Sequence, residues 1–194
     1  MSSSDGHRRP PAWTYVALST AIIGVAALIL LAMGRTPWCR CDSIKLWTND
    51  AWGPENSQQF TDPYTFTHVT HGVLLYLLLW VVARKQLLGT RVVLAVALES
   101  GWEILENTDM VINRYRALTM ALGYYGDSVL NSVGDILACV VGFALAARLP
   151  TRATVGMVIV LEVTLTLWIH DSLLLNIVML IYPIDAVRTW QLGK

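Results

Sequence analysis

Long apolar stretches alternate with short polar segments along this chain, a pattern typical of a polytopic membrane protein. Residues 10–34 carry no charge. Within them, Thr14 to Met33 would form about 30 Å of helix, enough to cross a bilayer. Comparable stretches run from Pro63 to Ala83, from Ser128 to Ala147 and from about Thr154 to Ile169. Each predicts a transmembrane helix.

A further segment is apolar from Arg91 to Leu98 and then becomes acidic. We expect it to span the membrane and to continue as a helix through Asp109. Residues 172–184 are also free of charge, but they would form only about 20 Å of helix. Ser172 predicts an N-cap for that helix, and Pro183 predicts its end.

The predicted fold is therefore all-α, a polytopic transmembrane helix bundle of five spans. A C-terminal helix follows, which is interfacial, re-entrant or a short sixth span. Of the 194 residues, 55% are hydrophobic and 14% are charged, against roughly 25% charged in soluble domains. We predict a single integral membrane domain over residues 1–194, with residues 1–12 as a disordered cytoplasmic tail.

Charge adds two conclusions. The 14 basic and 14 acidic residues cancel, which argues against a nucleic-acid partner. Seven basic residues lie beside span ends that would face the cytoplasm and five beside ends that would face outward, which favours a cytoplasmic N-terminus. The two sets are Arg8, Arg9, Arg84, Lys85, Arg91, Arg148 and Arg152 inside, and Arg35, Arg40, Lys45, Arg114 and Arg116 outside. We predict that the loop over residues 34–67 then faces the periplasm.

Small and aromatic residues refine this picture. Gly134 and Gly142 predict close helix approach in the span that begins near Ser128. Tryptophans in the 34–67 loop are expected at the headgroup level. Cys39 and Cys41 lie in the same loop, but one intervening residue is a poor spacing for a disulfide. A bridge to another chain or a weak metal site is a less favoured reading of that pair.

Polar residues form stripes on three of the predicted helices. A spacing of i, i+4, i+7 places three glutamates within about 60° of one helix face. A spacing of i, i+4, i+8 forms a second stripe, and two histidines stand one turn apart on a third helix. These residues are Glu99, Glu103 and Glu106, then Asp127, Asn131 and Asp135, and finally His68 and His71. A charge at mid-bilayer is costly, so we expect these groups to share one site near the outer leaflet.

Three chemistries fit such a site. A histidine beside a carboxylate is suited to acid–base work. His68, His71 and two glutamates have the ligand types of a metal site, but the Glu-x-x-His signature of di-metal bundles is absent. We therefore assign no metal ligand, and the sequence leaves the identity of any cofactor open. Arg114 and Arg116 are candidates for anion binding, such as a lipid phosphate, and for pairing with the acids.

Less functional readings stand beside these. The glutamates would be half-exposed if their helix left the membrane near Leu105, and the two arginines would then anchor the interface. Glu162 is isolated at mid-span, where a protonated acid bonded to a neighbouring helix is as good a reading as a functional one. His170-Asp171 is interpreted as a helix boundary.

Several of these residues also belong to blocks that resemble a bacterial family, uncharacterised protein family 0314, or domain of unknown function 2585. The resemblance covers Trp13 to Gln191 and implies a multi-pass inner-membrane protein, without implying an activity. The blocks are Tyr64-Thr65-Phe66-Thr67-His68-x-x-His71-Gly72, Trp102-Glu103-Ile104-x-Glu106-Asn107, Arg114-Tyr115-Arg116, Gly126-Asp127-Ser128-x-x-Asn131-Ser132-x-x-Asp135 and Asp171-Ser172-x-x-x-Asn176. A shorter pattern is similar to VanZ-like envelope proteins, except that Glu106-Asn107 replaces the expected Glu-Gln and Asp135 is an extra acid.

Three functions are consistent with these observations. The first is binding or modification of a lipid or lipid-linked envelope component, with membrane lipids as partners. The second is a small proton- or ion-coupled transporter that uses Glu162, Asp135 and the glutamates as a relay. The third is a structural subunit whose acids only pair helices. The pattern leaves open whether the chain is an enzyme and whether it forms a homo-oligomer.

Overall fold

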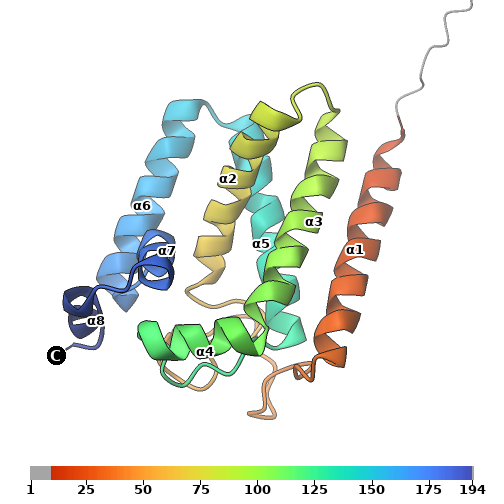
Figure 1. The fold of residues 1–194 in the computed structure, drawn as a ribbon. Coiled ribbons are helices and arrows are strands. Elements are labelled where there is room, and N and C mark those ends of the chain that lie inside the picture. The colour runs from red at the N-terminus through yellow and green to blue at the C-terminus, as the bar shows by residue number, and fades with distance from the viewer. Residues whose placement is uncertain (1–9, 194) are drawn as a thin grey trace, which may run out of the picture.

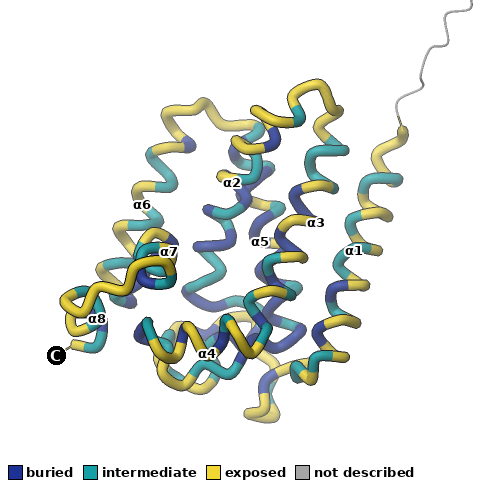
Figure 2. Tube along the Cα trace, in the orientation of Figure 1, coloured by how far each residue is buried: buried dark blue, intermediate teal, exposed yellow. Residues whose placement is uncertain are grey.

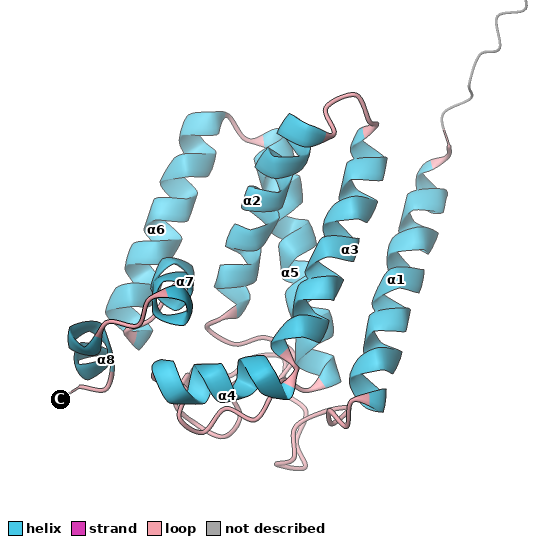
Figure 3. Cartoon of the chain, in the orientation of Figure 1, coloured by secondary structure: helices cyan, strands magenta, loops and turns pink. Residues whose placement is uncertain are grey.

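The computed structural model describes residues 10–193, which contain helices, turns and loops but no strand (Figure 3). Of the predicted disordered tail, residues 1–9 lie outside this described part. The helices in chain order are α1 Ala12–Ala32, α2 Thr65–Val82, α3 Leu88–Glu106, α4 Asp109–Leu118, α5 Val129–Arg148, α6 Thr151–Ile169, α7 Leu173–Ile181 and α8 Asp185–Gln191.

Four of these helices, α1, α2, α5 and α6, are long and apolar enough to cross a membrane. Their bounds agree with the predicted stretches to within three residues. Most side chains of α1 and α6 remain exposed (Figure 2), as expected of apolar helices that face lipid. The 19-residue α3 runs beside α1 (Figure 1), but its acids keep it outside this set. A span by α3 therefore stays a prediction.

The centre of the bundle is the α2–α5 pair, which packs at close range because glycines line its contact. A Cβ atom added at Gly72 would collide with the carbonyl oxygen of Cys139, and one at Gly142 with that of Val69. A Cβ at Gly134 would meet the backbone of the loop that precedes α2. The prediction of close helix approach is confirmed for Gly142, whereas Gly134 permits close approach of the loop rather than of a helix.

The expectation that one helix continues through Asp109 is wrong. The helix α3 ends at Glu106, and the Thr108 side chain accepts a hydrogen bond from the Val111 backbone N–H at the start of α4. Threonine favours such an N-cap over a helix interior because its hydroxyl competes for backbone groups. The chain turns there, so that α4 lies across the lower end of the bundle (Figure 1).

The segment between α1 and α2 packs beneath α5 rather than projecting away from the bundle. The Ser128 N–H donates to the carbonyl oxygen of Ser57 over 2.9 Å, and the Asn131 side-chain amide donates to that of Gln59 over 2.9 Å. The Trp47 ring stacks on Trp168, with 6.2 Å between ring centroids. This loop therefore forms part of the structure that positions the lower end of α5.

Within this loop, Cys39 and Cys41 form a disulfide, contrary to the expectation from their spacing. The chain turns at residues 40 and 41, which brings the two Cα atoms to 5.1 Å. That separation lies in the range usual for disulfides. The spacing was misleading because this local turn gives two cysteines that are close in sequence a separation that such pairs rarely have.

After α6 the chain forms two short helices. His170 ends α6 in a left-handed conformation, and the Ser172 hydroxyl caps α7 by accepting from the Leu175 N–H, so both boundary predictions are confirmed. The nine residues of α7 make about 14 Å of helix, too short to cross a bilayer. Pro183 lies between α7 and α8.

Candidate functional site

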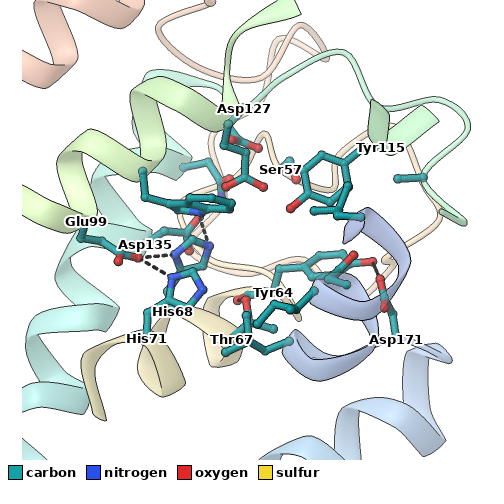
Figure 4. A pocket seen from close by; sticks show the side chains of 18 of the residues that line it. Ser57, Tyr64, Thr67, His68, His71, Glu99, Tyr115, Asp127, Asp135 and Asp171 are labelled. Atoms are coloured by element: carbon teal, nitrogen blue, oxygen red, sulfur yellow. Dashed lines mark hydrogen bonds and ion pairs between the residues drawn. The ribbon is translucent and has the colours of Figure 1, made fainter. Parts of the chain in front are cut away.

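A cavity of about 350 Å³ lies between α2, α3, α4 and α7 at the lower end of the bundle. Its polar lining comes from separate parts of the chain, including the segment after α4 and the start of α5 (Figure 4). The ionisable or amide residues that line it are Asn56, Tyr64, His68, His71, Glu99, Glu106, Tyr115, Tyr124, Asp127, Asn131, Asp135, Asp171 and Asn176. Seven of the eight predicted cluster residues are among them.

The two histidines share one carboxylate oxygen. The Nδ1 atoms of His68 and His71 lie 2.7 and 2.9 Å from Oε1 of Glu99 (Figure 4). A carboxylate oxygen only accepts, so each imidazole donates its Nδ1–H there. In the neutral form both Nε2 atoms then keep a lone pair. Glu99 thereby fixes the orientation and the tautomer of both rings.

Two more carboxylates stand close to His68. Oδ1 of Asp135 accepts a hydrogen bond from the Thr65 hydroxyl over 3.1 Å, and its Oδ2 lies 3.8 Å from Nε2 of His68. Glu103, the eighth predicted cluster residue, is fully buried behind the cavity wall. Its Oε1 lies 3.4 Å from Nδ1 of His68, and neither of its carboxylate oxygens has a hydrogen-bond partner among the described residues.

Asp127 occupies the loop end of the cavity. Its carboxylate accepts from the Asn107 side-chain amide over 2.8 Å and from the Tyr124 hydroxyl over 3.0 Å. The Asp127 backbone N–H in turn donates to the Asn107 side-chain oxygen over 2.8 Å. Burial raises the pKa of Asp127 to about 6, although these hydrogen bonds act in the opposite direction.

Asp171 brings the C-terminal part of the chain to the cavity. It accepts hydrogen bonds from the Tyr64 hydroxyl and from the Gln191 side-chain amide, each over 3.0 Å. Burial raises the pKa of Asp171 to about 6. Sequence analysis treated it only as a helix boundary, although it opens one of the family-like blocks. Burial also raises the pKa of Tyr64 well above its usual value.

Phenols are the other group that sequence analysis missed. Tyr115 and Tyr124 line the cavity with their rings in edge-to-face contact, 5.6 Å between centroids. Burial raises the pKa of both well above the usual value, so they are hydrogen-bond donors near neutral pH. Tyr115 lies inside the Arg-Tyr-Arg block, of which only the two arginines were predicted to have a role.

The predicted arginines lie outside the cavity. Arg114 and Arg116 are exposed, and the Arg114 Nε–H donates to the carbonyl oxygen of Leu180 near the end of α7 over 2.7 Å. Among residues 10–193, neither arginine pairs with a carboxylate. The cavity lining contains no lysine or arginine. Arg35 does form an ion pair with Asp109, over 3.8 Å, but outside the cavity.

Comparison with known proteins identifies relatives over almost the whole length of the chain. The family model described as "Protein of unknown function (DUF2585)" matches residues 30–193. A UPF0314 protein of Paracoccus denitrificans is 50% identical over 95% of this chain and 93% of its own length. One from Rhizobium meliloti is 46% identical over 99% and 96%. No solved structure matches.

These relatives come from bacteria, as the resemblance implied. A UPF0314 protein of Sphingopyxis alaskensis is also similar, at 42% identity over 91% of this chain and 94% of its own length. The further similarity to VanZ-like proteins stays a prediction. Because both the family model and these relatives cover most of the chain, it belongs to the DUF2585 family, whose curated members are called UPF0314 proteins.

Proposed function

We propose that this protein binds an amphipathic lipid or lipid-linked envelope component in the cavity and holds the polar group of that molecule against His71, Asp127 and the phenols. The observation that carries the proposal is the polarity gradient along the cavity. On α2 the lining changes from His68 and His71 to Leu74 and Leu75 one turn further on. A molecule with one polar end and one apolar end matches such a lining.

The facing helix repeats this gradient in the opposite chain direction. On α3 the lining runs from Glu106 through Trp102 and Glu99, which bonds to both histidines, to Leu98, and α3 is antiparallel to α2 (Figure 1). The polar ends of both helices therefore meet at the same level, and their leucines meet deeper in the bundle. From α7, Leu173, Ile177 and Leu180 add apolar surface.

Charge narrows the class of headgroup. Because carboxylates line the cavity without a lysine or arginine, an anion would be repelled unless a cation accompanied it. Hydroxyl, sugar or amine groups are favoured instead, since carboxylates accept hydrogen bonds from all three. His71, whose Nδ1–H is held by Glu99, offers Nε2 as the acceptor for a proton. Modification by acid–base chemistry is thus open to this site.

The transporter hypothesis is less well supported. Its relay requires Glu162 to join the other acids, but Oε2 of Glu162 accepts a hydrogen bond from the Leu174 N–H over 3.1 Å at the start of α7. Glu162 does not line the cavity. The acids that do line it gather at one end of the bundle, which is the arrangement expected of a binding site rather than of a path across the membrane.

We further propose that the cavity opens near the periplasmic leaflet of the inner membrane, with the N-terminus in the cytoplasm. The Cys39–Cys41 disulfide belongs to the loop beneath the cavity. Disulfides persist in the periplasm and are rare in the cytosol. This observation supports the orientation that the basic residues predict.

The test fills the apolar part of the cavity without touching its polar groups. Leu74→Trp adds bulk at a lining position of α2, whereas Leu77→Trp adds the same bulk at an exposed position of the same helix outside the cavity. A deletion strain is complemented with each variant, and its envelope phenotype and lipid composition are measured. Leu74→Trp should fail at normal protein level, and Leu77→Trp should complement. Equal complementation by both would contradict lipid binding in the cavity.

One more variant separates the lipid-binding hypothesis from the transporter hypothesis. Glu162→Gln leaves the cavity lining intact but removes the acid that a proton relay would need. The binding hypothesis expects complementation by Glu162→Gln close to that of the parent. Loss of complementation with unchanged amounts of membrane protein would favour the transporter.

A further inference from the structure

We propose that His68, Glu103 and Asp135 bind a divalent transition-metal ion, with zinc as the best candidate. One ligand atom from each of the three lies within 4.8 Å of the others. They come from three helices, α2, α3 and α5. The sequence has the ligand types of a metal site but lacks the Glu-x-x-His signature, and these three ligands lie far apart along the chain. Packing of α2 against α3 and α5 brings them together.

The orientation of His68 leaves one nitrogen for an ion. Its Nδ1–H donates to Glu99 over 2.7 Å, so the lone pair of Nε2 is unused and lies 3.8 Å from Oδ2 of Asp135. This distance is too long for a hydrogen bond. It is close to the separation of about 3.4 Å between neighbouring ligand atoms of a tetrahedral ion with bonds of about 2.1 Å.

Glu103 provides the second, independent observation. Its side chain is fully buried, and neither carboxylate oxygen has a hydrogen-bond partner among the described residues. A buried carboxylate without partners is strongly disfavoured. The Oε1 atom of Glu103 lies 3.4 Å from Nδ1 of His68, which already donates to Glu99. Glu103 is therefore assigned as a ligand from its place within 4.8 Å of the other two ligand atoms, and coordination of an ion by one of its oxygens would remove the penalty.

Charge balance points to a divalent ion. Two carboxylates, Glu103 and Asp135, neutralise its charge, and the imidazole of His68 adds no charge. The ion and its three ligands are then neutral together, and the further charge of Glu99 is stabilised by the N–H groups of His68 and His71. No lysine or arginine of the described chain lines the cavity, so no basic side chain there can neutralise the two carboxylates. Nitrogen together with oxygen ligands suits zinc better than magnesium or calcium, which take oxygen ligands.

Glu99 would not bind the ion itself but would orient His68, which binds it. A carboxylate that accepts the distal N–H of a metal-binding histidine fixes the ring and raises its basicity. Two other groups of potential ligands share a residue with this one. In the group of His68, His71 and Glu99, the 2.7 and 2.9 Å separations are those of hydrogen bonds and leave no room for an ion between the atoms. The group of Glu103, Glu106 and Asp127 has no nitrogen ligand, and its three carboxylates would leave a divalent ion with a net negative charge.

The experiment measures metal in the full-length protein, purified in detergent without a histidine tag and without chelators. Elemental analysis should find about one zinc ion per chain. Glu103→Gln and Asp135→Asn, which preserve side-chain shape, should lower zinc affinity at least 100-fold. Asp171→Asn is the matched control, since it removes a carboxylate of the same cavity outside the proposed ligand set. A metal-free parent that also fails to bind added zinc or manganese would overturn the proposal.

A melting-temperature measurement distinguishes loss of zinc binding from a folding defect, and the zinc content of further variants locates the ion. Added zinc should raise the melting temperature of the chelator-treated parent and of Asp171→Asn, but not that of Glu103→Gln. His71→Ala should keep one zinc per chain, whereas loss of zinc from His71→Ala would place the ion on the alternative group and refute this assignment. Glu99→Gln should bind zinc 10- to 100-fold more weakly. His68 and Asp135 line the same cavity, but the two proposals are tested separately, the ion by metal content and the lipid by the leucine variants.

Discussion

Asp171 is a carboxyl group removed from water at the junction of α6 and α7. Its hydrogen bonds to Tyr64, Ser172 and Gln191 favour the charged form, yet burial outweighs them and raises its pKa to about 6. An acid whose pKa is raised on folding stabilises the protein below its ordinary pKa of 3.8. That contribution is lost as the pH rises through about 6.

We therefore expect the stability of the parent to fall relative to Asp171→Asn between pH 4 and pH 7. The asparagine does not titrate, and its side chain can still bond to Tyr64 and Gln191. A shift of two pKa units corresponds to about 3 kcal/mol, or roughly 5 to 10 °C in melting temperature. Thermal unfolding of both proteins in detergent across this range measures it. A constant difference from pH 4 to pH 7 would show that burial does not perturb Asp171.

A second prediction at this scale separates a working site from scaffolding. We expect Asp127→Asn and Glu103→Gln to accumulate normally and, when compared free of bound metal, to be at least as heat-stable as the parent, while complementation of a deletion strain is lost. Acids held for binding or chemistry often reduce stability. Acids of a structural ion pair would instead cost roughly 3 to 5 kcal/mol when one partner is removed. Disappearance of both variants from the membrane would assign the acids a structural role.

Helix periodicity predicted much of the site, because residues three, four or seven apart share a helix face. His68 and His71 on α2 and Glu99 on α3 do converge. The same reasoning missed Asp171, since its place depends on how α6 and α7 pack against the start of α2. It also missed the end of α3, where a single threonine cap at Thr108 outweighed the continuing helical pattern.

The close α2–α5 contact leads to a prediction about stability. Gly72→Ala forces a Cβ against backbone atoms of Cys139 and Phe143, which cannot rotate away, so we expect a loss of about 1 to 3 kcal/mol. Gly101→Ala on α3 meets no atom within 4 Å and should stabilise the helix by up to about 1 kcal/mol. Melting temperatures in detergent compare the two. Equal effects would mean that α2 and α5 are not in close contact.

The whole chain has one orientation in the membrane, and this determines which leaflet the cavity faces. From the distribution of basic residues, a reporter fused at Asn49, in the loop before α2, should give a periplasmic signal. A reporter at Gly89, at the start of α3, should give a cytoplasmic one. The opposite pair of signals would move the cavity and the disulfide to the cytoplasmic side.

The loop before α2 binds to a helix that is made some 70 residues later. Carbonyl groups of Ser57 and Gln59 accept hydrogen bonds from Ser128 and Asn131. During synthesis these acceptors have no partner until α5 has been made, so the end of the cavity that α5 and this loop form is completed late. Two co-expressed fragments divided in the exposed turn between α2 and α3 should therefore each be inactive alone and recover function only on meeting in the membrane.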